Sequence, residues 1–146
     1  MKPENIFLLE DGQLKIGDFG TARVLDPEKQ RKGNAGTMFY LPPEYFMNGR
    51  ADFAADIWAV GCILCEVVKG RKVFEDEDKA KNSPPSLKSR ILTQHPPPLP
   101  HHYSRHLRNT IHRMMRKNPK ERPNARDLAE NVLQYLVEDR EELEEF

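Results

Sequence analysis

Two short apolar runs near the start of the chain flank a turn. Ile6 to Leu9 is the first run, Leu14 to Ile16 is the second, and Glu10-Asp11-Gly12 lies between them. Short alternating runs joined by a Gly-containing turn are typical of paired β-strands, so the sequence predicts a small hairpin. Residues 26–37 are polar and contain glycine, and are therefore expected to form a loop.

The middle of the chain carries the strongest helix signal. Ala54 to Lys69 is apolar nearly all round, and Gly70 follows it directly. This pattern predicts a fully buried helix, and a glycine just past the end is a common C-cap. Ahead of it, Pro42-Pro43-Glu44-Tyr45 predicts the start of a short helix, because proline is well tolerated in a first helical turn.

The last third of the chain predicts two amphipathic helices. They cover Leu107 to Arg116 and Ala125 to Val137, with a break at Asn118-Pro119. The predicted fold class is therefore mainly α, with one short β-hairpin near the N-terminus. We expect one domain over residues 1–137 and an acidic C-terminal tail over residues 138–146, which is either a solvated helix end or a docking element.

Two segments between the expected helices are rich in charge or proline. Residues 75–86 are charged and contain proline, which predicts a surface insert. His95 to Pro100 is an extended proline segment. It is either an ordered loop that links two helices or a ligand for a proline-recognition module, because such segments adopt the polyproline II conformation.

Composition and charge limit the class of protein. The 146 residues are 38% hydrophobic and 32% charged, which is typical of one soluble globular domain. Lys plus Arg and Asp plus Glu number 23 each, so the net charge is zero and favours neither nucleic acid nor an anionic membrane. The longest apolar run, Ile57 to Cys65, is too short to span a bilayer. The first residues do not resemble a secretory signal.

The two cysteines, Cys62 and Cys65, lie three positions apart inside the apolar run. This spacing occurs in redox motifs and in halves of zinc sites, but here no turn residues separate the cysteines and no second pair exists. We therefore interpret them as two reduced cysteines of the core. Reduced thiols favour a cytoplasmic or nuclear location.

Short motifs with chemical meaning follow one another in order. They are Lys2-Pro3-Glu4-Asn5, then Asp18-Phe19-Gly20, then Gly36-Thr37 and Tyr40-Leu41-Pro42-Pro43-Glu44. In this order the chain resembles the protein kinase family, whose signature set is H-R-D-L-K-x-x-N, D-F-G and A-P-E. Asp56 to Gly61 and Arg122 extend the resemblance over essentially the whole chain. The resemblance implies the large, C-terminal lobe of the kinase fold, with the small lobe absent.

The resemblance also implies a chemistry, the ATP-dependent transfer of phosphate to Ser or Thr of protein substrates with Mg²⁺ as cofactor. By resemblance, Asn5 gives an amide oxygen to one Mg²⁺ ion and Asp18 gives a carboxylate, both hard oxygen ligands. Lys2 would stabilise the transferred phosphate as a point charge. Lys2 and Thr37 are typical of the serine/threonine class, and Thr21 weakly suggests a threonine acceptor.

Further residues receive roles from the same resemblance. Ile6 and Leu8 would form the floor of the adenine site, Asp18, Phe19 and Gly20 would contribute to cofactor binding, and Gly36, Thr37 and Tyr40 would lie in the acceptor loop. Glu44 and Arg122 would form a buried ion pair. Asp56 would open the long helix and tie the catalytic loop to it through backbone N–H groups.

The later part of the chain narrows the resemblance. Pro97 to Pro100, Tyr103-Ser104, Lys117-Asn118-Pro119 and Arg122-Pro123 are similar to the NIMA-related kinases. The chain departs from the family pattern in the insert over residues 75–86. It also has Pro42 where the family more often has alanine or serine.

The largest departure from the family lies at the first residues. The family's catalytic base is an aspartate two residues before the lysine, but Lys2 follows only Met1 here. The small lobe, with its glycine-rich loop and its phosphate-holding lysine, is also missing from this sequence. We therefore expect this chain alone to be inactive. Met1 is then an internal Met taken as a start, or the start of a real short isoform or of a half that is assembled with a partner. The alternative function is a catalytically dead lobe that binds or regulates partners.

The segment from Val24 to Gly36 contains no Ser, Thr or Tyr. Many kinases order this segment by phosphorylation, so we expect the parent enzyme not to be switched on by a phosphate there. A scaffold that acts through the proline segment and the acidic tail is the third interpretation. It has the least support from the sequence.

Overall fold

The computed structural model describes residues 1–17, 35–49, 52–75 and 85–144, and the side chains of these except residues 35–37 and 136–144. Its elements in chain order are η1 (Pro3–Asn5), β1 (Ile6–Leu8), β2 (Leu14–Ile16), η3 (Ala35–Tyr40), α2 (Pro43–Asn48), α3 (Phe53–Lys69), α4 (Leu87–Thr93), α5 (Arg105–Met114), η4 (Pro119–Glu121) and α6 (Ala125–Glu144). The described residues are mainly helical, as predicted. None of their helices is long and apolar enough to cross a membrane.

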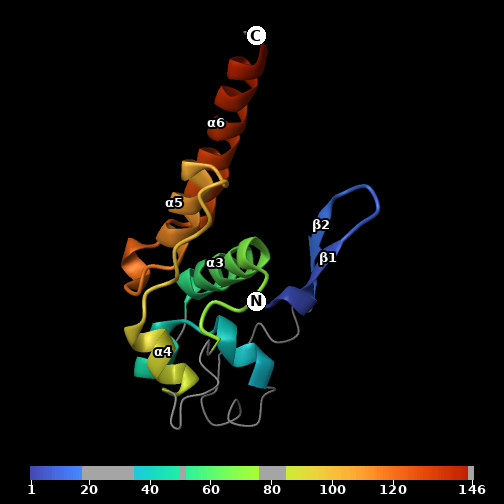
Figure 1. Ribbon diagram of the computed structural model, residues 1–146. Coiled ribbons are helices and arrows are strands. Elements are labelled where there is room, and N and C mark those ends of the chain that lie inside the picture. Colours follow the sequence, from blue (N-terminus) through green and yellow to red (C-terminus); the bar gives the residue numbers. More distant parts are fainter. Residues whose placement is uncertain (18–34, 50–51, 76–84, 145–146) are drawn as a thin grey trace.

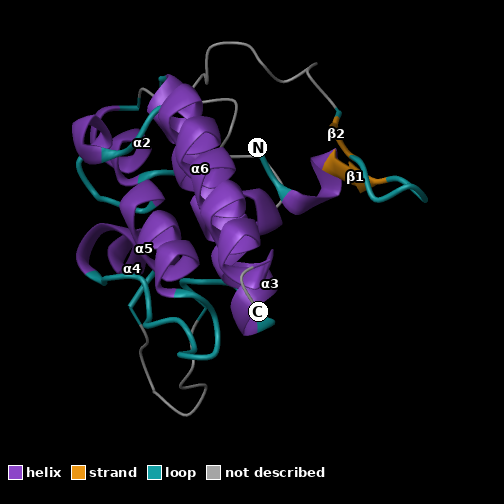
Figure 2. Ribbon diagram, turned by 90° about the horizontal axis from the view of Figure 1, so that it is seen from above, coloured by secondary structure: helices purple, strands orange, loops and turns teal. Residues whose placement is uncertain are grey.

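The predicted hairpin forms, and it projects away from the helices (Figures 1 and 2). β1 and β2 pair antiparallel, with Ile6 opposite Ile16. In the turn, Gly12 has a φ of 81°, a left-handed conformation that a residue with a Cβ rarely adopts. The backbone N–H of Gln13 donates to Asp11 Oδ1 at 3.0 Å, which closes the turn.

Helix α3 lies at the centre of the molecule (Figure 1). The Asp52 carboxylate accepts a hydrogen bond from the Ala54 N–H, and the helix ends at Gly70 with a φ of 70°. The predicted span and glycine cap are therefore confirmed to within one residue. The prediction that Asp56 opens the helix is wrong. Asp52 opens it, because its carboxylate satisfies a free N–H of the first turn.

Only part of α3 is buried. Its buried residues are Trp58, Ala59, Gly61, Cys62, Ile63 and Cys65. Val67, inside the predicted span, is 74% exposed, so the prediction of a fully buried helix is wrong; Phe53, just before that span, is 93% exposed. The reason is that α3 packs on α5, η3 and η4, which leave part of its surface uncovered.

The two cysteines are buried in α3 and free. Burial raises the pKa of the Cys65 thiol to about 11, and it raises the pKa of Cys62 further. Thiols with raised pKa values form little thiolate at neutral pH and are unreactive. The interpretation as core cysteines is confirmed.

A glycine allows α3 to approach the end of α5 closely. A Cβ atom on Gly61 would lie 2.8 Å from Met115 Cγ and 3.0 Å from Met114 Cβ. Both methionines are buried, and Met115 belongs to the main hydrophobic cluster. The missing side chain of Gly61 therefore makes room for the core.

The loop between α4 and α5 contains the proline segment. Leu99 is buried, and Lys69 Nζ donates to the Pro98 carbonyl at 3.3 Å. These contacts confirm the interpretation as an ordered loop between two helices. Helix α5 starts two residues earlier than predicted, because the Ser104 hydroxyl caps it by accepting from the Leu107 N–H.

The remaining predictions are confirmed in part. The short helix α2 starts at Pro43 as predicted. Of the loop expected over residues 26–37, residues 35–37 belong to η3, and the rest lies outside the described residues. Residues 76–84 of the predicted insert also lie outside the described residues. Helix α6 continues through the predicted tail to Glu144, which agrees with the interpretation of the tail as the end of a helix.

Candidate functional site

The first candidate segment is a single turn of 3₁₀ helix that leads directly into β1. Pro3 begins this turn, where its fixed φ suits a helix start and its missing N–H costs nothing. The Asn5 N–H donates to the Lys2 carbonyl at 3.1 Å, and the Ile6 N–H donates to the Pro3 carbonyl. The motif Lys2 to Asn5 is therefore a compact turn with a defined backbone.

The hairpin brings Asn5 next to the residue that precedes the second candidate motif. The Gly17 N–H donates to the Asn5 carbonyl at 2.8 Å, one step beyond the strand pairing. Gly17 directly precedes Asp18 in the sequence. The hairpin therefore joins the backbone of Asn5 to the residue before Asp18, although thirteen positions separate the two side chains along the chain.

Several predicted site residues cannot be placed. Asp18, Phe19, Gly20 and Thr21 lie outside the described residues. Gly36 and Thr37 belong to η3, whose backbone is described there without these side chains. Lys2 is half-buried and has an extended backbone, with φ −156° and ψ 160°.

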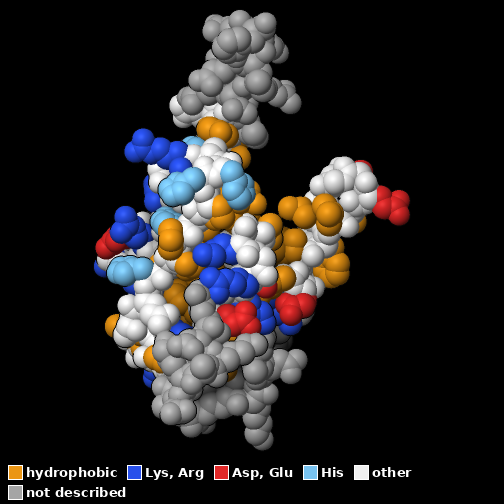
Figure 3. All heavy atoms as spheres, viewed as in Figure 1, with side chains coloured by type: hydrophobic (Ala, Val, Ile, Leu, Met, Phe, Trp, Pro, Cys, Tyr) orange, Lys and Arg blue, Asp and Glu red, His pale blue; other side chains and the backbone are white. Residues whose placement is uncertain are grey.

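One face of the hairpin is apolar and exposed. Ile6 pairs with Ile16 and Leu8 pairs with Leu14, so all four side chains point to the same side of the two strands. Leu8 is 73% exposed and Leu14 is 68% exposed. Figure 3 shows orange side chains along the hairpin. Ile6 alone of the four packs partly against the core cluster. Apart from Ile6, this face packs against no part of the core cluster among the described residues.

Tyr40, a predicted acceptor-loop residue, lies in the core. It is 6% exposed, and its hydroxyl donates to Glu66 Oε2 of α3 at 2.6 Å. Burial, followed by the bond to Glu66, raises the pKa of the Tyr40 hydroxyl well above its usual value. Tyr40 therefore fastens the end of η3 to α3, and its predicted contact with the acceptor remains a prediction.

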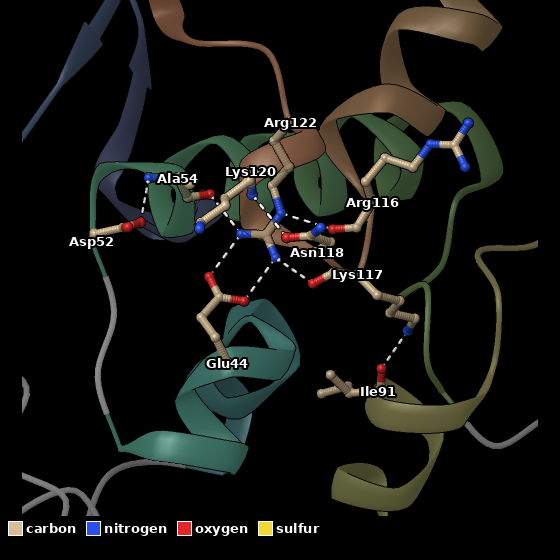
Figure 4. A network of polar contacts seen from close by, with 9 residues as sticks. All are labelled: Glu44, Asp52, Ala54, Ile91, Arg116, Lys117, Asn118, Lys120 and Arg122. Carbon is tan, nitrogen blue, oxygen red and sulfur yellow. Dashed lines mark hydrogen bonds and ion pairs between the residues drawn. The ribbon is translucent and has the colours of Figure 1, made fainter.

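The predicted ion pair between Glu44 and Arg122 is present and is bidentate (Figure 4). Both carboxylate oxygens of Glu44 accept from the guanidinium at 2.7 Å. The Arg122 side chain is fully buried and that of Glu44 is 12% exposed. This pair ties α2 to the segment that follows η4.

The guanidinium of Arg122 also binds three backbone carbonyls. Nε donates to Arg116 at 2.8 Å, Nη1 donates to Ala54 at 2.9 Å, and Nη2 donates to Lys117 at 3.2 Å. With the two bonds to Glu44, all five N–H donors of the guanidinium have acceptors. Lysine has three donors and cannot replace this arrangement.

Lys117, which the sequence marked only as part of a family resemblance, lies beside this network. Lys117 Nζ donates to the Ile91 carbonyl and lies 5.2 Å from the Trp58 ring centroid and 4.8 Å from that of Phe74. The two rings stack with centroids 5.9 Å apart. Burial lowers the pKa of Lys117 to about 8. The sequence showed a lysine before Asn118-Pro119, but nothing in it marked the rings as its neighbours.

Asp56 lies near the first residue of the chain. Its side chain is 64% exposed, and Oδ1 lies 3.6 Å from the backbone nitrogen of Met1. The predicted role of Asp56 in tying the Lys2 to Asn5 segment to α3 stays a prediction. The expected hydrogen bonds from backbone N–H groups do not appear among the described residues.

Oxygen donors for a metal are few in the described part of the chain. No group of three or more His, Cys, Asp or Glu side chains that could hold a metal occurs there. The Asn5 amide is half-buried, next to the residue before Asp18. One amide and one carboxylate suit Mg²⁺, which keeps several waters and takes the rest of its ligands from phosphates. The donor set therefore fits this ion.

Comparison with known proteins agrees with the motifs. A family model described as "Protein kinase domain" matches residues 1–134. The chain is 39% identical over 143 residues to "Probable serine/threonine-protein kinase nek3" of Dictyostelium discoideum, covering 93% of this chain and 12% of that protein.

Two further relatives match over a similar range. "Serine/threonine-protein kinase Nek1" of Mus musculus is 37% identical, over 89% of this chain and 10% of that protein. "G2-specific protein kinase nimA" of Emericella nidulans is 34% identical, over 94% of this chain and 19% of that protein. The chain therefore spans between about a tenth and a fifth of the length of these relatives.

Proposed function

Because the chain belongs to the protein kinase family, with NIMA-related serine/threonine kinases matching most of its length, we propose that it is the large lobe of such a kinase. The predicted family resemblance is confirmed. The observation that carries the proposal is the hydrogen bond from the Gly17 N–H to the Asn5 carbonyl, which joins the backbone of Asn5 to the residue before Asp18. The proposed activity is phosphoryl transfer from ATP to Ser or Thr of proteins.

Each candidate residue has a proposed role in this activity. Asn5 and Asp18 hold Mg²⁺ through oxygen atoms, and Lys2 places a positive charge beside the transferred phosphate. Bound Mg²⁺ neutralises charge on the phosphates of ATP. Ile6, Leu8, Asp18, Phe19 and Gly20 contribute to the nucleotide site, and Gly36, Thr37 and Tyr40 shape the loop that receives the acceptor.

We also propose that these 146 residues cannot transfer phosphate by themselves. They contain neither an H-R-D motif nor a glycine-rich nucleotide loop, and such groups act as a unit with the metal ligands. The exposed apolar face of the hairpin supports the proposal, since Leu8 and Leu14 would gain contacts from a small lobe and from adenine.

The experiment compares this chain alone with the same chain joined to the small lobe and catalytic-loop start of mouse Nek1. Transfer of labelled phosphate from ATP to a general acceptor such as casein is measured. We expect no transfer by the chain alone and transfer by the chimera. Steady turnover by the chain alone would overturn the proposed inactivity.

A matched pair of variants tests the site in the chimera. Asp18→Asn removes the proposed metal-binding carboxylate and is expected to lower turnover by about 10³-fold or more. Asp11→Asn makes the same change in the hairpin turn and keeps an oxygen for the Gln13 N–H, so activity is expected to stay unchanged. Equal activity of the two variants would remove Asp18 from the site.

A further inference from the structure

Charge is distributed very unevenly along this neutral chain. From Lys79 to Lys120 the sequence contains no Asp or Glu, and all five histidines of the chain lie in this stretch. Five of the seven positions from Glu138 to Glu144 are acidic. The zero net charge is therefore the sum of a basic region and an acidic region at separate places in the sequence.

Helix α5 turns part of this basic region into one surface. Its apolar side chains face inward, with Ile111 and Met114 buried and Leu107 packed against the core cluster. Its other side carries four exposed basic or titratable residues, which we call the basic face. They are Arg105, His112, Arg113 and Arg116, the last of which follows the end of the helix by two residues. Figure 3 shows basic and histidine side chains gathered on this side of the molecule.

The arginines of the basic face have no structural partner in the described part of the chain. Arg105, Arg113 and Arg116 form no ion pair with a described acidic side chain. Arg108, by contrast, lies in the same helix and is fixed by bonds to the Tyr103 carbonyl and to His101. The basic face is therefore available to an external partner.

The basic face also opposes the stability of α5. Arg105 is the first residue of α5, and the first turn contains no acidic residue. A positive charge at this end opposes the helix dipole. An anionic partner would remove this penalty.

We propose that the basic face binds an Asp- and Glu-rich segment of a protein partner. From Arg105 to Arg116 the face is about 16 Å long, at 1.5 Å per helical residue. A peptide of about five residues in extended conformation covers this length. The surface lies on α5, away from the hairpin, so this binding is independent of phosphoryl transfer (Figure 1).

The arrangement of charges favours acidic side chains over other anions. A single phosphate group is best bound by arginines that converge on one point, whereas these are strung along the helix. A nucleic acid strand would continue past Arg105. His106 stacks on Tyr135 with ring centroids 4.4 Å apart, so α6 passes this end of α5 before reaching the acidic positions that follow. A long polyanion would extend past this end of α5 toward α6, whose following positions are acidic in sequence, whereas a short acidic segment would not.

The test uses the 146-residue chain and a fluorescent peptide of about ten alternating Asp and Glu residues. Binding is measured by fluorescence anisotropy at low salt and at about 0.2 M salt. The proposal expects saturable binding that weakens with salt. It also expects the Arg105→Glu, Arg116→Glu double variant to lose about tenfold or more in affinity.

A second double variant controls for overall charge. Lys15→Glu with Lys88→Glu makes the same change in net charge at exposed positions on the hairpin and on α4, and should bind like the original chain. Thermal unfolding shows that both variants are folded. Lack of peptide binding by the original chain, or equal losses in both variants, overturns the proposal. Tighter binding of a single-stranded oligonucleotide of equal charge also overturns it, because the face would then serve nucleic acid.

Discussion

The hairpin and the hydrogen-bond network around Arg122 differ in how completely their side chains are paired or covered. Around Arg122 every donor has an acceptor, and the side chain is fully buried among α2, α3 and η4. On the hairpin, Leu8 and Leu14 expose more than two thirds of their surface, with 73% and 68% exposed. The first region is complete within this chain, whereas the second presents apolar surface without a partner among the described residues.

This difference separates architecture from chemistry in the molecule. The residues that hold the helices together, such as Glu44, Tyr40 and Lys117, find their partners inside the chain. The candidate catalytic motifs lie on the hairpin and its flanks. A chain with a well-packed helical core can therefore carry candidate motifs on and beside an exposed hairpin. The predictions below test how sharply the two regions differ.

The largest effect is expected at the ion pair. Glu44→Ala leaves the buried guanidinium of Arg122 without its carboxylate, which should lower the free energy of unfolding by about 3–5 kcal/mol. Urea unfolding measures this, with Lys120→Ala as an exposed control expected within about 0.5 kcal/mol of the original chain. A loss below about 1 kcal/mol at Glu44 would mean that the network does not hold α2 in place.

The second largest loss of stability is expected where α3 packs against α5. Gly61→Ala puts a Cβ atom 2.8 Å from Met115 Cγ and 3.0 Å from Met114 Cβ, so the methionines must shift. Overpacking of this kind typically costs about 1–3 kcal/mol, measured again by urea unfolding. Gly70→Ala is the comparison variant, because its Cβ meets no atom within 4 Å and only backbone strain opposes it. An unchanged unfolding midpoint for Gly61→Ala would contradict the packing described above.

The pH dependence of stability should show the burial of Lys117. Its pKa is lowered to about 8 in the folded chain from 10.5. Above pH 8 the unfolded chain therefore keeps more protons, and stability rises with pH. The slope should stay below about 1.4 kcal/mol per pH unit, because solvent partly screens this half-buried group.

Comparison with Lys117→Met isolates this effect in urea unfolding between about pH 8 and pH 9. The cysteines oppose this rise from about pH 8 upward, since their folded pKa values are raised from 9.0 and make stability fall with rising pH. The difference between the original chain and Lys117→Met therefore carries the effect of Lys117. The methionine variant should lose the rise with pH, and Lys120→Met should keep it. A rise of equal size in the Lys117→Met variant would assign it to another group.

The smallest effect on stability is expected on the hairpin. Leu8→Ser removes a side chain that is 73% exposed, so the unfolding free energy of the chain alone should change by less than about 0.5 kcal/mol. In the chimera with the small lobe, the same substitution should weaken ATP binding, measured as a rise in KM. A KM that stays unchanged would remove Leu8 from the nucleotide site.

The sequence predicted the local structure well because the signals were local. Alternating residues around Gly12 gave the hairpin, and Gly70 marked the end of α3. The pair of Glu44 and Arg122 was predicted through a family resemblance, since 78 positions separate the two residues and no local pattern joins them. The exposure of Phe53 and Val67 was missed because composition does not tell which side of a helix finds a partner.

The site was predictable only as a set of motifs. The order of Lys2 to Asn5 and Asp18 to Gly20 indicated the chemistry, and the hydrogen bond between Gly17 and Asn5 joins the first motif to the residue before Asp18. The bond of Tyr40 to Glu66, and the position of Lys117 over two rings, depend on packing between distant segments. No local sequence pattern predicts such contacts.

Hydrogen exchange of the backbone amides tests most directly whether the helical core is complete while the hairpin is not. Exchange is measured by mass spectrometry for the chain alone and for the chimera with the small lobe. We predict slow exchange in α3 in both proteins, and fast exchange in the hairpin that becomes slow only in the chimera. A hairpin as protected as α3 in the chain alone would contradict the account.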